Sequence, residues 1–260
     1  MKIGIIGLGR VGELLVSCLK VKEPVNVYST RYNHEVGGIK LHESGKAVVE
    51  ASDVVFLSVP SKNLKDVLAE IKPFVRGKTI VNTSVGYTPS YVQKQLVKDV
   101  EVVHLIPSMI GLGHDKALFG YACRWQNSRK VKMKLRNVFQ ERIELLEINS
   151  RDLCRMTALI ACYPAFIYSF MDIIMSRGMD SGKFTKTEFD VIITSTKFAL
   201  DRFEEEVGSG EFLKKIETKG GATEAGIHML KRHKIDRGLL GALDAAEKNC
   251  KKRMKTYMSD

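Results

Sequence analysis

The stretch KIGIIGLGRVGEL, residues 2–14, decides how the chain folds. Residues 2–6 form a short apolar run that is typical of a buried strand, and residues 13–19 have the pattern of a helix. The glycines between them have the spacing G-x-G-x-x-G. The first allows a tight turn, the second lets a pyrophosphate approach the backbone, and the third lets the helix pack on the strand. We therefore predict a dinucleotide site, rather than a turn that binds no phosphate, at Gly7, Leu8, Gly9, Arg10, Val11 and Gly12.

The composition is that of an ordinary globular protein of one or two domains. The chain has 260 residues, of which 44% are hydrophobic and 27% charged. Its five cysteines include no C-x-x-C pair, which favours reduced thiols in a cytoplasmic protein over disulfides or a zinc site. The histidines show no metal-ligand spacing, so we predict no metal. The chain enters a strand at once, and we expect no signal peptide.

The longest apolar stretch, Met156–Met171, is interrupted by Pro164 and closed by Asp172. It looks too short and too broken for a membrane span. We expect a buried or dimer-facing helix and no membrane association.

The net charge is +11, with basic runs at residues 129–136 and 248–253. Such charge could serve nucleic acid, or it could attract an anionic cofactor and substrate. Neither run is interleaved with aromatic residues that would stack on bases. The sequence therefore favours the small anionic ligands.

The second predicted strand, residues 25–29, indicates which dinucleotide binds. In NAD sites an acidic residue follows this strand, about 20 residues beyond the glycines, and binds the ribose 2′-hydroxyl. Here Ser29, Thr30 and Arg31 stand in that place, with no carboxylate. A guanidinium suits a 2′-phosphate, so we predict NADP; the alternative is a plain surface arginine.

Strands and helices alternate through the first part of the chain, which predicts a doubly wound α/β domain. Ligands bind such sheets at the carboxyl ends of the strands. Ser58, Val59, Pro60 and Ser84 follow two of these strands and are predicted to contact the cofactor. Further strands are expected at residues 39–41, 53–60, 78–81, 101–105, 117–123 and 144–148, with helices over 45–51 and 63–71 and from Thr88 onward.

After Asn149 the pattern is helical only. Helices are predicted over residues 151–176, 185–207, 209–216, 222–233 and 236–257. We therefore expect a Rossmann cofactor-binding domain, residues 1–149, and a helical domain, residues 150–260.

Residues 219–223, Lys-Gly-Gly-Ala-Thr, precede one of these helices. Two glycines before a helix start expose several backbone N–H groups, which suits a carboxylate, and Lys219 adds positive charge. The alternative is an ordinary loop between helices.

In this order, the pieces resemble pyrroline-5-carboxylate reductase, the NADPH-dependent family that makes proline. The match extends from the glycine motif through Val59-Pro60, residues 106–110 and residues 164–166 to residues 219–223. The resemblance implies an intertwined homodimer through the helical domain, and a threonine, here Thr223, at the imine nitrogen of the substrate. The substrate residues that it implies are Ser108, Lys219, Gly220, Gly221, Ala222 and Thr223.

The sequence also departs from the family. Its Met-Pro-Asn-Thr-Pro is replaced by Ile106-Pro107-Ser108-Met109-Ile110, the lysine before Pro60 is absent, and Lys219 stands where a proline is usual. Tyr163 replaces a glycine and would reshape the substrate pocket. This mixture looks like the late-competence ComER branch of the family.

Two functions are therefore open. The first is an NADP-dependent oxidoreductase that transfers a hydride from NADPH to the C=N bond of 1-pyrroline-5-carboxylate, giving L-proline, or of a related imine. Thr223 or water would deliver the proton. The second is an NADP-binding regulatory or scaffold dimer, competence- or sporulation-like, with little catalysis.

Overall fold

The fold is described from a computed structural model, over residues 1–20, 22–31, 38–111, 116–124, 128–182, 184–205, 213 and 216–259. The chain forms two compact units. One comprises Met1–Pro164 and Ala245–Asp260, and the other comprises Ala165–Asp244. Most of the helix predicted over residues 209–216 lies outside the described residues.

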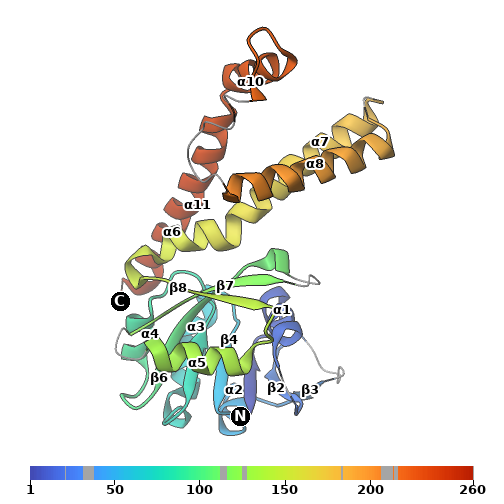
Figure 1. Cartoon of the computed structure of the whole chain (residues 1–260). Helices are drawn as coiled ribbons and strands as arrows, with labels where there is room; N and C mark the ends of the chain where they lie inside the picture. Colours follow the sequence, from blue (N-terminus) through green and yellow to red (C-terminus); the bar gives the residue numbers. More distant parts are fainter. Residues whose placement is uncertain are drawn as a thin grey trace. The chain divides into compact units, whose positions relative to one another are not determined.

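The first unit is built on one eight-stranded sheet with the order β3-β2-β1-β4-β5-β6-β7-β8 (Figure 1). The strands from β3 to β6 are parallel, as predicted for a doubly wound domain. Strand β7 runs antiparallel to β6, and β8 runs parallel to β7. The strands are β1 (Ile3–Ile6), β2 (Val25–Tyr28), β3 (Ile39–Leu41), β4 (Val54–Leu57), β5 (Thr79–Asn82), β6 (Glu101–Pro107), β7 (Ala117–Cys123) and β8 (Ile143–Glu147).

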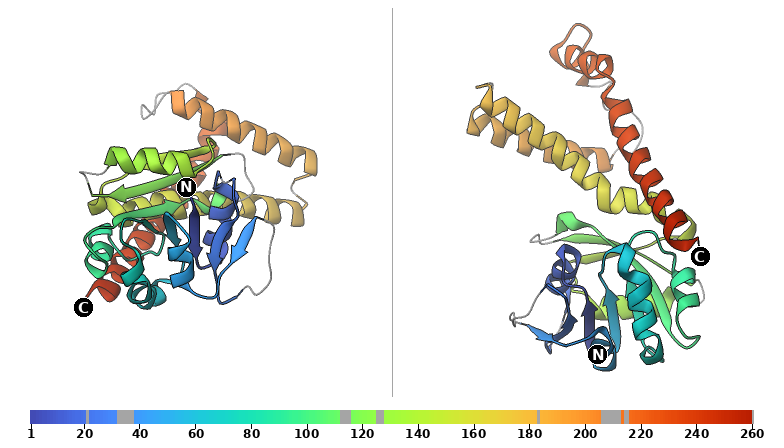
Figure 2. Two further views of the ribbon diagram at one scale, coloured as in Figure 1. Left: turned by 90° about the horizontal axis from the view of Figure 1, so that it is seen from below. Right: turned by 180° about the vertical axis from the view of Figure 1, so that it is seen from behind.

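Helices cover both faces of this sheet (Figure 2). Apolar residues of α1 and α5 join one buried cluster, where Phe139 meets Phe56 and Phe119 edge-on. Those of α2, α3 and α4 join the cluster on the other face. The predicted Rossmann architecture is therefore confirmed. The helices are α1 (Arg10–Cys18), α2 (Gly45–Glu50), α3 (Leu64–Ile71), α4 (Pro89–Gln95) and α5 (Ser128–Val138), with short 3₁₀ turns at Ser61–Asn63, Lys72–Phe74 and Met109–Gly111.

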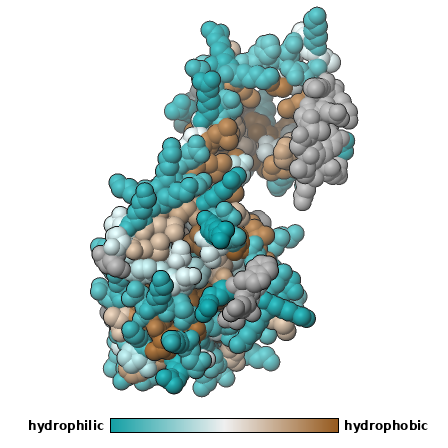
Figure 3. Space-filling view, turned by 90° about the vertical axis from the view of Figure 1, so that its left-hand side faces the viewer, coloured by the Kyte–Doolittle hydropathy of each residue, from teal (hydrophilic) through white to brown (hydrophobic). Residues whose placement is uncertain are grey.

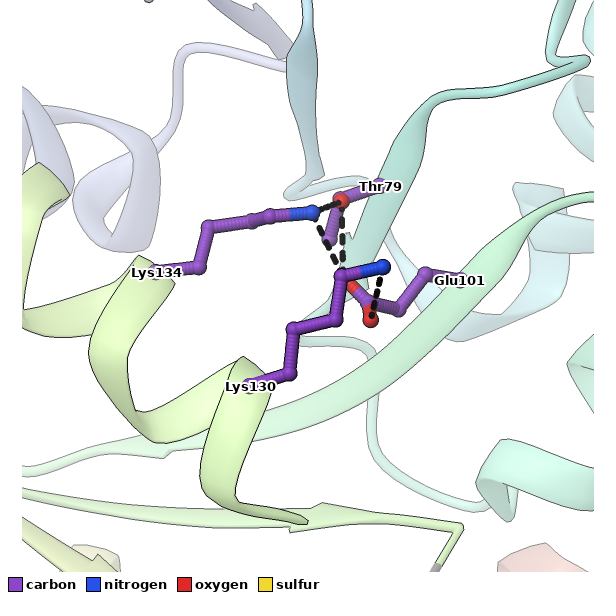
Figure 4. A network of polar contacts seen from close by, with 4 residues as sticks. All are labelled: Thr79, Glu101, Lys130 and Lys134. Atoms are coloured by element: carbon purple, nitrogen blue, oxygen red, sulfur yellow. Dashed lines mark hydrogen bonds and ion pairs between the residues drawn. The ribbon is translucent and has the colours of Figure 1, made fainter. Parts of the chain in front are cut away.

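A charged network ties α5 to the edge of the sheet opposite the carboxyl ends of the parallel strands (Figure 4). The carboxylate of Glu101 accepts from Lys134 Nζ at 2.7 Å and from Thr79 Oγ1 at 3.0 Å. Lys130 Nζ lies 3.9 Å from its other oxygen. The Glu101 side chain is only 9% exposed, so this pairing compensates a carboxylate that has lost most of its water.

The chain returns to the sheet at its C-terminal end. Helix α11 (Ile235–Met258) finishes against the loop that follows β5, where Tyr257 stacks on Tyr87 with the ring centroids 5.5 Å apart. Cys154 of α6 (Leu153–Thr157) donates to Met254 Sδ at 3.0 Å. These contacts place both ends of the helical region in the compact unit of the sheet, which is divided from the second unit at residues 164 and 244. The domain boundary near residue 150 remains a prediction.

Pro164 does not interrupt the long apolar helix, which continues through it as predicted over residues 151–176. It follows a π-helical turn, Ala158–Cys162, whose wider spacing accommodates the missing proline N–H before α7 (Tyr163–Asp180). Among the described residues, Ser150–Gly178 is the one helical stretch that is long and apolar enough to cross a membrane by length and composition. Only 11% of its apolar window is buried. This helix therefore needs another apolar surface to cover it.

The second unit exposes many apolar side chains, which appear brown among the polar atoms of Figure 3. Its described helices are α7 from Ala165 onward, α8 (Lys186–Glu205), α10 (Ala222–Arg232) and α11 as far as Asp244. Thr185 and Glu188 form a capping box at the start of α8. A unit with so much exposed apolar surface is typical of a chain that associates with a partner. The large exposed residues include Tyr168, Phe170, Ile173, Val191, Phe198, Leu200, Phe203, Met229, Leu230 and Leu240.

Candidate functional site

A pocket of about 1070 Å³ opens at the carboxyl ends of β1, β2, β4 and β5 within the first unit. This is the edge at which parallel sheets bind ligands. It is lined by nearly all of the residues predicted for the cofactor: Gly7, Leu8, Gly9, Arg10, Val11, Ser29, Thr30, Arg31, Ser58, Val59, Pro60 and Ser84.

The three glycines of the motif differ in backbone conformation and in the space around them. Gly7 has a φ of +98°, and a Cβ there would collide with the carbonyl of Ser58. Gly12 does not line the pocket. A Cβ on Gly12 would collide with the carbonyl of Gly7. A Cβ on Gly9 would meet nothing within 4 Å, because the backbone there faces open space. This opening in front of the α1 N-terminus suits a phosphate.

Arg31 lies at one end of the pocket, directly beyond β2. Its side chain is exposed, and its backbone N–H donates to Ser29 Oγ at 3.3 Å. Among the described residues no carboxylate takes the place that an NAD site would give it at the end of β2. The assignment of these polar side chains to a 2′-phosphate remains a prediction.

The exits of β4 and β5 form the central wall of the pocket. Ser84 Oγ donates to the carbonyl of Val59 at 2.7 Å and so joins the two loops. Ser58 Oγ is buried, and no described residue gives it a hydrogen-bond partner. A buried hydroxyl without a partner in the wall of a pocket is suited to bind a ligand that enters it.

Other residues of this pocket were not predicted from the sequence. Asp66, Val67 and Glu70 of α3 line it, as do Arg253 and Tyr257 of α11. The amphipathic pattern of α3 predicted the helix, but not which polar residues face the site. Arg253 lines the pocket because the end of α11 packs on the sheet unit. No local pattern in the sequence indicates this packing.

Two predicted substrate segments lie elsewhere. Ser108 is 3% exposed at the end of β6, its N–H donates to the carbonyl of Leu118, and it does not line the pocket. Lys219–Thr223 belongs to the second unit. The assignments of Ser108, Lys219, Gly220, Gly221, Ala222 and Thr223 to a substrate therefore remain predictions.

The turn before α10 has the geometry of a carboxylate site. Gly220 has a φ of +76°, and its N–H donates to the carboxylate of Glu224 at 2.6 Å. Gly221 caps α10 without a side-chain hydrogen bond, and Thr223 is exposed in the first turn. The backbone here already holds a carboxylate, one supplied by the chain itself.

Ligand atoms of Glu217, Glu224 and His228 lie within 4.8 Å of one another beside this turn. The sequence spacing did not predict this group, because the turn brings Glu217 back to the helix. Burial raises the pKa of the Cys162 thiol, which favours the protonated and less reactive form.

Comparison with known proteins bears out the predicted resemblance. Residues 151–253 match the family model of the pyrroline-5-carboxylate reductase dimerisation domain, and residues 2–86 match that of the coenzyme F420-dependent NADP oxidoreductases. A pyrroline-5-carboxylate reductase of Staphylococcus saprophyticus is 25% identical over 95% of both chains. ComE operon protein 4 of Bacillus subtilis is 26% identical over 88% of both.

Solved structures share the fold over nearly the whole length. Pyrroline carboxylate reductase of Plasmodium falciparum, determined with NADP bound, gives a TM-score of 0.88 at 19% identity over 98% of both chains. The enzyme of Streptococcus pyogenes gives 0.82 at 18% identity over 97% of this chain and 98% of its own. The chain thus resembles the pyrroline-5-carboxylate reductase family in both units, and the dimerisation match supports a homo-oligomer.

Proposed function

From this resemblance to the pyrroline-5-carboxylate reductase family, we propose that the protein is an NADP-dependent oxidoreductase that reduces a carbon–nitrogen double bond. The substrate is 1-pyrroline-5-carboxylate or a related small imine that carries a carboxylate. The observation that carries this proposal is the pocket at the carboxyl ends of the strands, whose lining includes the open backbone at Gly9 and the side chain of Arg31.

The residues of the pocket fit the cofactor. The space in front of Gly9 admits a diphosphate that a side chain would exclude, and the unpartnered Ser58 hydroxyl offers a donor to a bound ligand. Arg31, with Ser29 and Thr30, binds the 2′-phosphate. When bound, NADPH supplies the hydride, and the chain positions it against the pocket wall formed by Val59, Pro60 and Ser84.

The turn before α10 binds the carboxylate of the substrate. Its Gly220 N–H holds the Glu224 carboxylate in this structure, which is the same chemical group. The substrate carboxylate would replace that of Glu224 on the Gly220 N–H, with Lys219 adding charge. Thr223 orients the imine nitrogen, and the proton comes from water, either directly or relayed through the Thr223 hydroxyl, which water reprotonates.

The active protein is a homodimer in the cytoplasm. A second copy covers the apolar faces of α7 and α8, which the single chain leaves exposed. All five cysteines are free thiols, which suits a reducing compartment. Relatives named as reductases favour catalysis over the regulatory scaffold.

The first experiment measures NADPH consumption by the purified protein with pyrroline-5-carboxylate and a panel of cyclic and acyclic imines. We expect turnover that falls at least about tenfold in Thr223→Ala, because the loss of one hydrogen bond to a transition state typically lowers kcat by about 10²–10³. Thr187→Ala is the matched control, since Thr187 is also the exposed second residue of a helix, and it should keep the wild-type rate. No turnover with any imine would contradict the proposal.

A further inference from the structure

Arg253 lies in the C-terminal helix, yet it lines the same pocket as the phosphate-binding turn near the N-terminus. We propose that Arg253 binds the phosphate on the nicotinamide half of the cofactor, which makes the end of α11 a part of the cofactor site. The inference rests on the proposed NADP-dependent function and adds a residue that the glycine motif does not contain.

The backbone of α11 is held directly against the loop that leaves β5. Gly86 has a φ of +95°, and a Cβ added there would lie 3.2 Å from Arg253 Cβ and 3.0 Å from Tyr257 Cδ2. This close approach requires glycine. It places Arg253 next to Val85, which lines the pocket.

Aromatic and hydrogen-bonded contacts fix this position further. Tyr257 stacks on the fully buried ring of Tyr87 with an interplanar angle of 14°, and the Tyr87 hydroxyl donates to the carbonyl of Ser61 at 2.9 Å. Ser61 Oγ in turn donates to the carbonyl of Val85 at 2.7 Å. The loops after β4 and β5 and the last turns of α11 therefore form one packed wall within the first unit.

The order of the strands shows which end of the cofactor this wall faces. Arg31 follows β2, which lies on one side of β1 and marks the adenosine end. Strands β4 and β5 lie on the other side of β1, so the loop after β5 faces the nicotinamide end. Arg253, packed on that loop, lies at the end of the pocket away from Arg31.

The guanidinium is available for an anion. Its Nε donates to Asn249 Oδ1 at 3.1 Å, one helical turn back, which orients the group. In the described part of the chain this is its one polar contact, and the terminal nitrogens are left for a ligand. The charge of the lining also favours phosphate, with the cations Arg10, Arg31, Lys62 and Arg253 against the acids Asp66 and Glu70.

The test compares two ligands by equilibrium titration of the full-length protein without substrate. NADPH carries both halves of the cofactor, whereas adenosine 2′,5′-bisphosphate lacks the nicotinamide half. We expect Arg253→Ala to weaken NADPH about tenfold, the loss typical of one charge-assisted hydrogen bond, and to leave the bisphosphate within about twofold. Arg253→Lys should keep part of the affinity, because it keeps the charge.

Lys252→Ala is the matched control. It removes one positive charge from the same exposed turn, but Lys252 does not line the pocket, so NADPH affinity should stay at the wild-type value. Unchanged NADPH affinity in Arg253→Ala overturns the inference. If in addition the KM of the imine rises, Arg253 binds the substrate carboxylate instead. An equal loss for the bisphosphate also overturns it. A wild-type protein that does not bind NADPH overturns the proposed function itself.

Discussion

The side-chain amide of Asn82 lies 3.2 Å from Nδ1 of His104, and both residues are almost fully buried. Asn82 Oδ1 accepts from the N–H of Ser84, which leaves the amide nitrogen to donate to the histidine. His104 Nδ1 is therefore an acceptor, and the ring is neutral with its proton on Nε2. This pair supports the turn at Ser84, in the wall of the pocket.

The burial of His104 predicts a pH dependence of stability. Burial lowers the pKa of His104 from 6.5 to about 4. Between these values the unfolded chain binds a proton that the folded chain does not. The contribution of the neutral His104 to stability is therefore fully present above pH 6.5 and is lost as the pH falls toward 4. The loss approaches about 3 kcal/mol at the low end. Urea unfolding of wild type and His104→Gln between pH 4 and 6.5 measures this loss. It is the difference between the two proteins in the slope of unfolding free energy against pH.

His233→Gln is the control for this prediction, because His233 is exposed. It should keep the pH slope of the wild type, and His104→Gln should be flatter than both. Carboxylates titrate alike in all three proteins and cancel in the comparison. If His104→Gln kept the full slope, the histidine would not be the group that titrates.

Much of the first unit follows from local sequence. The apolar run before Gly7, the strand over residues 39–41 and the capping threonine before Pro89 lie where they were expected. These features depend on neighbours within a few residues, through side-chain pattern, glycine conformation and capping. Most of the residues that line the pocket could be predicted because the glycine motif and the strand ends come together wherever such a sheet forms.

The parts that depend on distant residues could not be predicted. Nothing near Ala117 indicates that β7 runs antiparallel to β6. The π-helical turn before Pro164 has no sequence signature, and Arg253 lines the pocket because Tyr257 stacks on Tyr87 and holds α11 on the loop after β5. The direction of β7 and the position of Arg253 depend on contacts between segments that are far apart in the chain. The π-helical turn is a local change of the backbone that the sequence pattern does not indicate.

The buried carboxylate of Glu101 should matter for stability. Glu101→Gln leaves Lys134, which is 27% exposed, without its counter-charge, and we expect the free energy of unfolding to fall by about 2 kcal/mol. Glu141→Gln breaks the exposed pair with Lys20, 3.7 Å apart, and should change it by less than about 0.5 kcal/mol. Urea unfolding of both variants makes the comparison. Equal effects would mean that the burial of Glu101 adds nothing.

Two glycine substitutions should separate folding from binding. Gly12→Ala forces α1 away from the turn at Gly7, and we expect a loss of about 1–3 kcal/mol of stability. Gly9→Ala has room for its methyl group, so stability should stay within about 0.5 kcal/mol while NADPH affinity falls at least about tenfold. Thermal unfolding and NADPH titration of the two variants check this. A Gly9→Ala protein that binds NADPH normally would show that no phosphate approaches there.

Arg31 should decide between NADPH and NADH. The two cofactors differ only in the 2′-phosphate, and Arg31 stands beyond β2 beside Ser29, with no described carboxylate in the place where an NAD site has one. Arg31→Ala should weaken NADPH about tenfold or more and leave NADH nearly unchanged, because only NADPH loses a charge-assisted hydrogen bond. Titration of both cofactors, at two salt concentrations, measures the ratio. Arg253→Ala, which faces the shared nicotinamide half, should instead weaken both cofactors alike. Equal losses in Arg31→Ala would place that arginine outside the recognition of the 2′-phosphate.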